Sequence, residues 1–208
     1  MKIILENTGK KYIHSWIFRN INLELAAPGH YGVLGANGSG KTTLLKTLSG
    51  FLPASEGTIH WHLQQKDVSE NIFRYVSWAS PHLELIEEFT FEEVLLFHQK
   101  FKPWVGNHSP SSLIELSGLK YNRSKALKYY SSGMKQRVKL LLAVMSNNPL
   151  VILDEPCSNL DTASIEWYRK LLEAHMGDRL LLIGSNDKET ECFSCNNFID
   201  ISDFKPGA

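Results

Sequence analysis

A glycine-rich segment near the N-terminus has the composition of a phosphate-binding loop. It reads Gly35-Ala36-Asn37-Gly38-Ser39-Gly40-Lys41-Thr42 and fits the pattern G-x-x-x-x-G-K-[ST] at every position. Glycines let backbone N–H groups curl around phosphate oxygens, and a following helix adds the positive end of its dipole. Lys41 would bring a cation to the β- and γ-phosphates, and the Thr42 hydroxyl could ligate Mg²⁺. The residues predicted to bind a nucleotide here are Gly35, Asn37, Gly38, Ser39, Gly40, Lys41, Thr42 and Thr43.

Two adjacent acids end an apolar segment later in the chain. Leu150-Val151-Ile152-Leu153 leads directly into Asp154 and Glu155. Neighbouring residues on a strand point to opposite faces, so the two carboxylates can take different roles. We expect Asp154 to hold Mg²⁺ and its waters, and Glu155 to accept a proton from an attacking water as general base. Solvated acids at a strand end are the alternative interpretation.

The sequence lacks the markers of other classes of phosphate-binding protein. A GTPase would need an Asn-Lys-x-Asp segment, which does not occur. A small-molecule kinase would need a lid and an acceptor pocket, and the sequence carries no marker of either.

The three cysteines are Cys157, Cys192 and Cys195, and the last two form a Cys-x-x-Cys. That spacing can mark half of a zinc site or a redox pair. No second Cys or His pair follows at metal-ligand spacing. We therefore expect reduced thiols near the surface.

The composition predicts one folded domain with no attraction for nucleic acid. The chain has 208 residues, of which 43% are hydrophobic, enough for one core and too few for two ordinary domains. Lys plus Arg and Asp plus Glu both total 22, so nothing attracts nucleic acid over a long range. No segment approaches the roughly 20 apolar residues that cross a bilayer, and the N-terminus lacks the apolar core of a signal peptide. We therefore expect a cytoplasmic protein.

The elements that would position these residues are strands at both ends of the chain and helices in the middle. Strands are predicted at 3–7, 21–25, 31–35, 58–63, 72–78, 150–154, 179–184 and 197–201. Helices are predicted at 41–48, 91–101, 112–118, 133–146, 162–175 and 188–192. Two of them begin with a capping box, Thr90 with Glu93 and Ser112 with Glu115. This order indicates a mainly parallel sheet covered by helices, with a helical insertion in the middle.

Further segments resemble the ATP-binding-cassette (ABC) family, whose motifs follow in the same order over the whole chain. Asp154-Glu155-Pro156 is followed by Ser158-Asn159-Leu160-Asp161, which is similar to the D-loop of that family. Upstream, Tyr130-Ser131-Ser132-Gly133-Met134 resembles its signature motif, usually Leu-Ser-Gly-Gly-Gln. The resemblance implies an α/β P-loop NTPase fold with a mainly parallel sheet, N-terminal antiparallel strands and an inserted helical subdomain. Residues 1–208 would form one ABC ATPase domain, with a nucleotide-binding core at 1–78 and 148–208 and the helical subdomain at about 79–147.

The resemblance also implies a function, that of an ATP-hydrolysing subunit driving a separate transmembrane permease from the cytoplasmic face of the membrane. Two cassettes, identical or different, would close head to tail, and ATP on Lys41 of one would be capped by Ser131 and Gly133 of the other. A hydroxyl and a glycine N–H at a helix N-terminus suit an anion. Tyr12 lies where the family carries an aromatic residue that stacks on adenine. Trp16 is the competing candidate, and either residue could belong to the core.

Two positions depart from the pattern of the family. Where the family places a glutamine that contacts Mg²⁺ and the attacking water, after a strand at 72–76, Trp78 stands. Where it places a histidine that contacts the γ-phosphate, Asn186 stands. Trp78 cannot ligate a metal, and Asn186 can donate a hydrogen bond but cannot carry a positive charge. We therefore predict intact ATP binding with slow hydrolysis, in which Lys41, Glu155 and Asn186 take part.

The segment 81–91 lies where the helical insertion of the family meets the membrane subunit. Its apolar and acidic residues are interleaved: Leu83, Leu85, Ile86 and Phe89 with Glu84, Glu87 and Glu88. One interpretation is a groove with an acidic rim, which would suit a basic partner. The other is a loop packed on its own helices.

Two other functions are compatible with the sequence. A regulatory clamp would bind ATP and dimerise with little hydrolysis, which the two departures favour and Glu155 opposes. A non-transport cassette would act on ribosomes or DNA. Such members resemble two fused cassettes, or a cassette split by a coiled coil, and this chain has neither feature.

Overall fold

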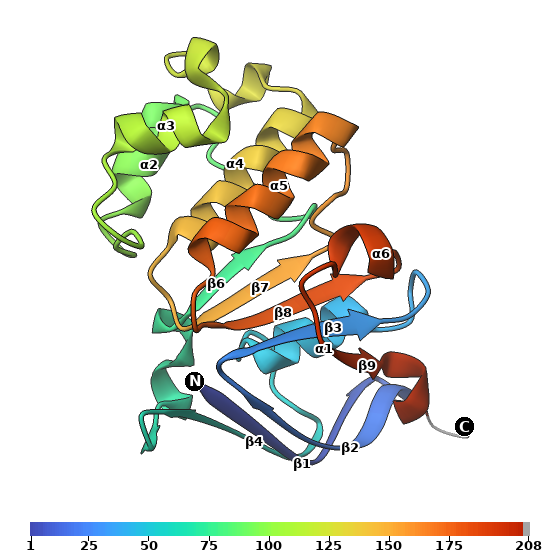
Figure 1. Cartoon of the computed structure of the whole chain (residues 1–208). Helices are drawn as coiled ribbons and strands as arrows, with labels where there is room; N and C mark the ends of the chain where they lie inside the picture. The colour runs from blue at the N-terminus through green and yellow to red at the C-terminus, as the bar shows by residue number, and fades with distance from the viewer. Residues whose placement is uncertain (206–208) are drawn as a thin grey trace.

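A five-stranded parallel sheet forms the centre of the protein, in a computed structural model that describes residues 1–205 (Figure 1). In spatial order its strands are β6 (Val76–Ala79), β7 (Leu150–Asp154), β8 (Leu180–Ser185), β3 (Gly29–Leu34) and β9 (Asn197–Asp200). Every residue of β7 and β8 is buried, as expected for apolar strands covered on both faces. Because all neighbouring strands are parallel, their carboxyl ends meet at one edge of the sheet.

A second, antiparallel sheet is formed by the N-terminal third of the chain. Its order is β2 (Ser15–Ala26), β1 (Lys2–Tyr12), β4 (Glu56–Leu63) and β5 (Lys66–Asp67). Helix α1 (Lys41–Leu48) lies between the two sheets (Figure 1). Its Leu44 and Leu45 are fully buried in a core shared with Phe18 of β2 and Ile152 of β7. The predicted P-loop NTPase fold, with N-terminal antiparallel strands, is confirmed.

The longer remaining helices lie on the other side of the parallel sheet (Figure 1). Helices α4 (Ser132–Met145) and α5 (Thr162–His175) cover its face, and α2 (Phe91–His98) and α3 (Pro110–Ser117) pack outside α4. The short helix α6 (Lys188–Glu191) follows β8. Within residues 1–205, no helix combines the length and the hydropathy that a membrane span requires.

Two predictions about elements are wrong. Residues Ser69–Arg74 form a 3-10 helix, and β6 begins only at Val76. Ile72 is buried and the neighbouring Phe73 is 63% exposed, a pattern that a strand would also give, but only Val76–Ala79 pair with β7. Helix α3 begins with Pro110, and its capping box pairs Ser109 with Ser112 instead of Ser112 with Glu115. Proline suits the first helical position because its φ is already fixed there.

Candidate functional site

The glycine-rich segment forms the turn between β3 and α1. Gly38 and Gly40 have φ values of 74° and 112°, a region that favours glycine. A Cβ on Gly40 would lie 2.4 Å from Cγ2 of Ile17 on β2, so a larger residue would not fit. The loop therefore requires glycine for its conformation and for its packing, and it presents its N–H groups at the N-terminus of α1.

Lys41 is the first residue of α1, and its side chain folds back over the loop. It is 4% exposed, and its ammonium group donates to the carbonyl oxygens of Gly35 at 2.8 Å and Ala36 at 3.1 Å. The first turn of α1 contains no acid, and none of the ion pairs found in residues 1–205 includes Lys41. The loop thus combines a helix N-terminus with the ammonium group of Lys41, which favours an anion.

Thr42 and Asp154 come together although they lie far apart in the sequence. The Thr42 hydroxyl donates to Oδ2 of Asp154 at 2.7 Å. Asp154 is 2% exposed, and this burial raises the pKa of its carboxyl group, against the opposing effect of the Thr42 hydrogen bond. Its Oδ1 and the buried Oγ of Ser39 have no hydrogen-bond partner in the described part of the chain. Unpartnered oxygens of this kind fit a hard cation such as Mg²⁺, which prefers carboxylate and hydroxyl ligands.

Glu155 follows β7 in a left-handed conformation with a φ of 45°. Residues other than glycine rarely adopt it, and such strain is typical of functional sites. Its N–H donates to the carbonyl oxygen of Gly184 at 2.8 Å, which ties the turn to β8. Glu155 and Asn186 both line a cavity of about 260 Å³. An acid held in this way can act on a water molecule at the carboxyl ends of the parallel strands.

Asn186 lies directly after β8 and reaches the phosphate loop. Its side-chain N–H donates to Oδ1 of Asn37 at 3.0 Å. The phosphate loop, Asp154 and Asn186 therefore lie together at the edge of the parallel sheet where the carboxyl ends of the strands meet, which we call the strand edge.

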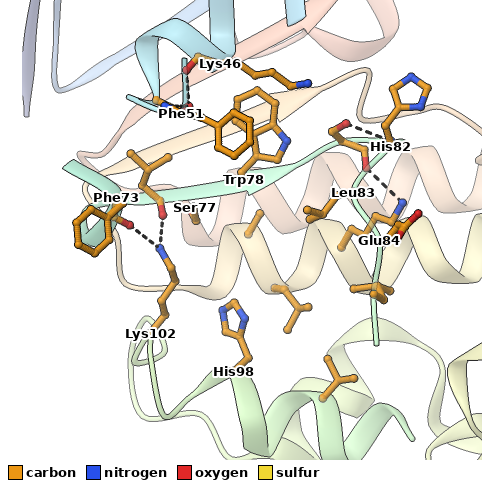
Figure 2. A pocket seen from close by; sticks show the side chains of 18 of the residues that line it. Lys46, Phe51, Phe73, Ser77, Trp78, His82, Leu83, Glu84, His98 and Lys102 are labelled. Atoms are coloured by element: carbon orange, nitrogen blue, oxygen red, sulfur yellow. Dashed lines mark hydrogen bonds between the residues drawn. The ribbon is translucent and has the colours of Figure 1, made fainter. Parts of the chain in front are cut away.

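The assignment of Trp78 to the position after the strand is wrong. Trp78 lies inside β6, opposite Ile152, two residues before the position level with Asp154. At about 3.3 Å per residue, this places it roughly 7 Å short along the strand. Figure 2 shows Trp78 beside Phe51 in the wall of a groove. After the strand, the imidazole of His82 lies near enough to Asp154 to favour the ionised carboxylate.

Ser131 and Gly133 lie at the start of α4, and Gly133 lies against the predicted D-loop segment. The Ser131 hydroxyl accepts a hydrogen bond from the N–H of Met134 at 3.2 Å and caps the helix. A Cβ on Gly133 would lie 2.7 Å from the carbonyl oxygen of Asn159. In residues 1–205, no hydrogen bond joins either residue to the phosphate loop of the same chain.

A bulge in the β1–β2 hairpin places the side chains of Tyr12 and Trp16 on opposite faces of the sheet. Lys10 pairs with Phe18 and Lys11 with Trp16, which leaves Ile17 as the extra residue of the bulge. The Trp16 ring faces Gly9, on the outer side of the sheet. Lys10 and Tyr12 share the opposite, inner face, with the Lys10 ammonium 5.5 Å from the Tyr12 ring. Because Ile17 contacts the phosphate loop, this geometry favours Tyr12 for contact with a base.

Glu191, which the sequence did not single out, lies in the same region. It is 5% exposed, lines the cavity beside Glu155, and accepts a hydrogen bond from the N–H of Cys157 at 2.8 Å. The expectation of thiols near the surface is wrong for Cys192 and Cys195, which are 2% and 8% exposed.

A groove of about 810 Å³ opens between the sheet and the outer helices (Figure 2). It is lined by exposed apolar side chains, namely Phe51, Phe73, Leu83, Ile86 and Phe97. The charged side chains in its wall are Lys46, Lys102, Lys139 and Glu84.

The predicted acidic rim is wrong for this groove. Of the three glutamates considered, only Glu84 lines it, and Glu87 is paired with Lys135. The lysines instead make the wall positive. Lys102 donates to the carbonyl oxygens of Phe73 and Val76, and burial lowers the pKa of its ammonium group.

Residues 18–158 match the model of the family described as ABC transporter. The cytochrome c biogenesis ATP-binding export protein CcmA of Dechloromonas aromatica is 32% identical over 77% of this chain and 79% of its own length. The bacitracin transport ATP-binding protein BcrA of Enterococcus faecalis is 31% identical over 87% of this chain. ATP-binding cassette sub-family A member 17 of Mus musculus is 31% identical over 73% of this chain. The chain spans 60% of the length of the bacitracin protein and 9% of that of the mouse protein.

Solved structures agree on the fold. An ATP-binding subunit of an ABC transporter superposes with a TM-score of 0.81 at 21% identity, over 96% of this chain and 85% of that chain. A dimeric ATP-binding cassette in a post-hydrolysis state, bound to ADP and Pi, gives 0.78 at 19% identity, over 95% and 93%.

Proposed function

Because this chain belongs to the ABC transporter family, we propose that it is the ATP-binding and ATP-hydrolysing subunit of a transporter whose membrane-spanning permease is a separate chain. The observation that carries the proposal is the strand edge where Lys41, the Thr42–Asp154 hydrogen bond, Glu155 and Asn186 come together. The subunit would work at the cytoplasmic face of the membrane that holds the permease.

The phosphate loop would bind the triphosphate of ATP. Its backbone N–H groups and the ammonium of Lys41 supply the positive field, and the N-terminus of α1 adds to it. For Lys41 to contact the phosphates, its ammonium would exchange the carbonyl oxygens of Gly35 and Ala36 for phosphate oxygens. Tyr12, on the inner face of the hairpin, would stack on the adenine.

Thr42 and Asp154 would hold a Mg²⁺ ion. When bound, such an ion neutralises charge on the phosphates of the nucleotide. The fit rests on the unpartnered Oδ1 of Asp154 and on the adjacent Thr42 hydroxyl. A bound cation would offset the cost of burying the ionised Asp154 carboxylate.

Glu155 would take a proton from the water that attacks the γ-phosphate. The left-handed turn at this residue places it at the carboxyl edge of the sheet, where it lines the cavity beside Asn186. Asn186 would donate its side-chain N–H to the γ-phosphate, exchanging its present contact with Asn37. An amide cannot carry the positive charge of an imidazolium, and we therefore expect slow turnover.

A second cassette would complete the site. Ser131 and Gly133 at the N-terminus of α4 offer a hydroxyl and a backbone N–H to an anion, and neither contacts the phosphate loop of its own chain in residues 1–205. Capping ATP from a partner chain would use both groups. The partner would be an identical chain or a complementary cassette.

The groove beside Trp78 would receive a segment of the permease. Its apolar side chains suit an amphipathic segment, and Figure 2 shows that Lys46 and Lys102 reach it from opposite sides. Neither lysine is part of an ion pair found in residues 1–205. Charge complementarity therefore favours a permease segment that carries a carboxylate between apolar side chains. Because β6 leads from this groove to the strand edge, docking would act on the nucleotide site.

The test is the turnover of Mg-ATP by the purified chain beside a Glu155→Gln variant, with Glu173→Gln on the exposed face of α5 as the control. We expect phosphate release by the wild type and the control, and its loss in Glu155→Gln with ATP binding retained. Tight ATP binding without phosphate release by the wild type would instead favour a regulatory clamp, for which the asparagine at 186 is the supporting observation.

A further inference from the structure

Glu191 is a buried acid that the proposed reaction does not use directly. It ends α6 and is 5% exposed, although carboxyl groups are rarely buried unless they are paired or hydrogen-bonded. Burial raises the pKa of its carboxyl group, and two hydrogen bonds oppose that effect. A group held at this cost requires an explanation.

The two hydrogen bonds join two different segments of the strand edge. One carboxyl oxygen accepts from the N–H of Cys157 at 2.8 Å, and the other contacts the hydroxyl of Ser185. Cys157 lies two residues after Glu155, and Ser185 immediately precedes Asn186. The Glu191 carboxyl group therefore bridges the segments that carry both candidate catalytic side chains.

The bridge also supports a strained turn. Glu155 has a φ of 45°, which neighbouring contacts must maintain. Backbone hydrogen bonds hold it on both sides, from its own N–H to Gly184 at 2.8 Å and from the N–H of Ser158 to its carbonyl oxygen at 3.1 Å. Between these, the Cys157 N–H is held by the side chain of Glu191.

Helix α6 is itself anchored, so the bridge has a rigid support. The fully buried Tyr168 of α5 donates its hydroxyl to the carbonyl oxygen of Glu191 at 3.0 Å. At the other end of α6, Asp187 caps the helix by accepting from the N–H of Thr190 at 3.1 Å. The backbone that carries the Glu191 side chain is therefore anchored at both ends of α6.

We propose that Glu191 is a positioning residue for ATP hydrolysis, which fixes Glu155 and Asn186 relative to each other by bridging the turn after β7 to the end of β8. This inference rests on the proposed function, since it concerns the rate of the same reaction. It assigns Glu191 no contact with ATP or with the attacking water.

Two substitutions of Glu191 show whether its hydrogen bonds are needed. Glu191→Gln keeps an oxygen for the Cys157 N–H and places an amide N–H toward the hydroxyl oxygen of Ser185. Glu191→Ala removes the hydrogen-bond partner of the Cys157 N–H. Glu189→Ala is the matched control, because it removes an exposed carboxylate from the same helix.

The first readout is the dependence of turnover on ATP concentration for these variants. Since a small misplacement of reacting groups can cost about 10²-fold in rate, we expect Glu191→Ala to lower kcat by about that factor and to leave the KM for ATP unchanged. Glu191→Gln should keep most of the wild-type kcat, and Glu189→Ala all of it. A wild-type kcat in a folded Glu191→Ala protein would overturn the inference.

The second readout is backbone hydrogen exchange in residues 155–158, which requires no hydrolysis. We expect exchange there to be about tenfold faster in Glu191→Ala, and close to the wild-type rate in Glu191→Gln. An unchanged rate in Glu191→Ala would overturn the inference. Absence of turnover in the wild type would overturn the proposed function, while the exchange rates still decide whether Glu191 holds the turn. If Glu191→Ala does not fold, Glu191→Asp, whose side chain is one methylene group shorter, takes its place in both measurements with the same expected direction.

Discussion

Replacing Asp154 by asparagine is expected to stabilise the nucleotide-free protein and to abolish its stabilisation by Mg²⁺ with a nucleotide. Asp154 is 2% exposed, and its Oδ1 has no hydrogen-bond partner among residues 1–205. An ionised carboxylate in that position destabilises the folded state, because water solvates the charge in the unfolded chain. A site prepared for a cation should therefore cost stability when no cation is bound.

The magnitude follows from the contacts of the carboxyl group. A buried ionised carboxylate that lacks a hydrogen-bond partner costs more than a neutral amide in the same position. Asparagine removes the charge and keeps an oxygen for the Thr42 hydroxyl, so we expect Asp154→Asn to raise the free energy of unfolding at pH 7 by about 1–2 kcal/mol. Burial raises the folded-state pKa of Asp154 above the ordinary value of 3.8. The destabilising effect of the ionised carboxylate is therefore complete above the raised pKa and is lost as the pH falls through that pKa. The free energies of unfolding of the wild type and Asp154→Asn should thus converge toward pH 4.

The assay is urea unfolding in EDTA at pH 7 and at pH 4.5, repeated at pH 7 with Mg²⁺ and ADP. Ligand at about 100 times its Kd should stabilise the wild type by about 2.7 kcal/mol and the variant by much less, which reverses their order. Asp178→Asn, at an exposed acid, is the control. The reasoning is refuted if Asp154→Asn is less stable than the wild type in EDTA at pH 7, or if both gain equally from the nucleotide.

Three further predictions concern other parts of the molecule. Asn186→His should raise kcat about tenfold at constant KM for ATP, because an imidazolium can carry positive charge toward the γ-phosphate; a lower kcat in steady-state assays would contradict this role. Lys102→Glu should weaken cosedimentation of the chain with membranes of the source cells, and Lys100→Glu, outside the groove, should not; equal losses would exclude the groove as the docking surface. Burial lowers the pKa of His98 to about 4, so the folded state stays neutral while the unfolded chain takes up a proton as the pH falls below 6.5. The free energy of unfolding of the wild type should fall by up to about 3 kcal/mol more than that of His98→Gln between pH 6.5 and pH 4, as measured by urea unfolding. Equal losses in the two proteins would refute a lowered pKa for His98.

The best sequence predictions were those with strong local signals. The bounds of β7 and α5 agree with the sequence, because an apolar run ends in two acids and Asp161 supplies an N-cap that accepts from Ser164 at 2.8 Å. The segment 72–78 misled the prediction because its apolar residues resemble a strand while only its second half can pair with β7. Because the strand was predicted to begin at residue 72, Trp78 was assigned to the position after it instead of to β6.

Other features depend on tertiary contacts that no local pattern carries. A bulge places the rings of Tyr12 and Trp16 on opposite faces of one hairpin, which the sequence pattern does not indicate. Glu191 meets Cys157 across 34 positions in the sequence, and nothing in its own helix distinguishes it from the exposed Glu189. Likewise, the lysines in the wall of the groove come from three separate elements, so its charge could not be predicted from the segment 81–91 alone.

Hydrolysis of ATP between two cassettes with Glu155 as the base can be tested by measuring turnover across a range of protein concentrations. For identical partners, phosphate release by the wild type should rise more steeply than the protein concentration, and Glu155→Gln should abolish it. Adding the variant to the wild type should then lower the rate per wild-type chain. Turnover that is strictly proportional to concentration, or that persists in Glu155→Gln, would exclude a dimeric hydrolase with Glu155 as the base.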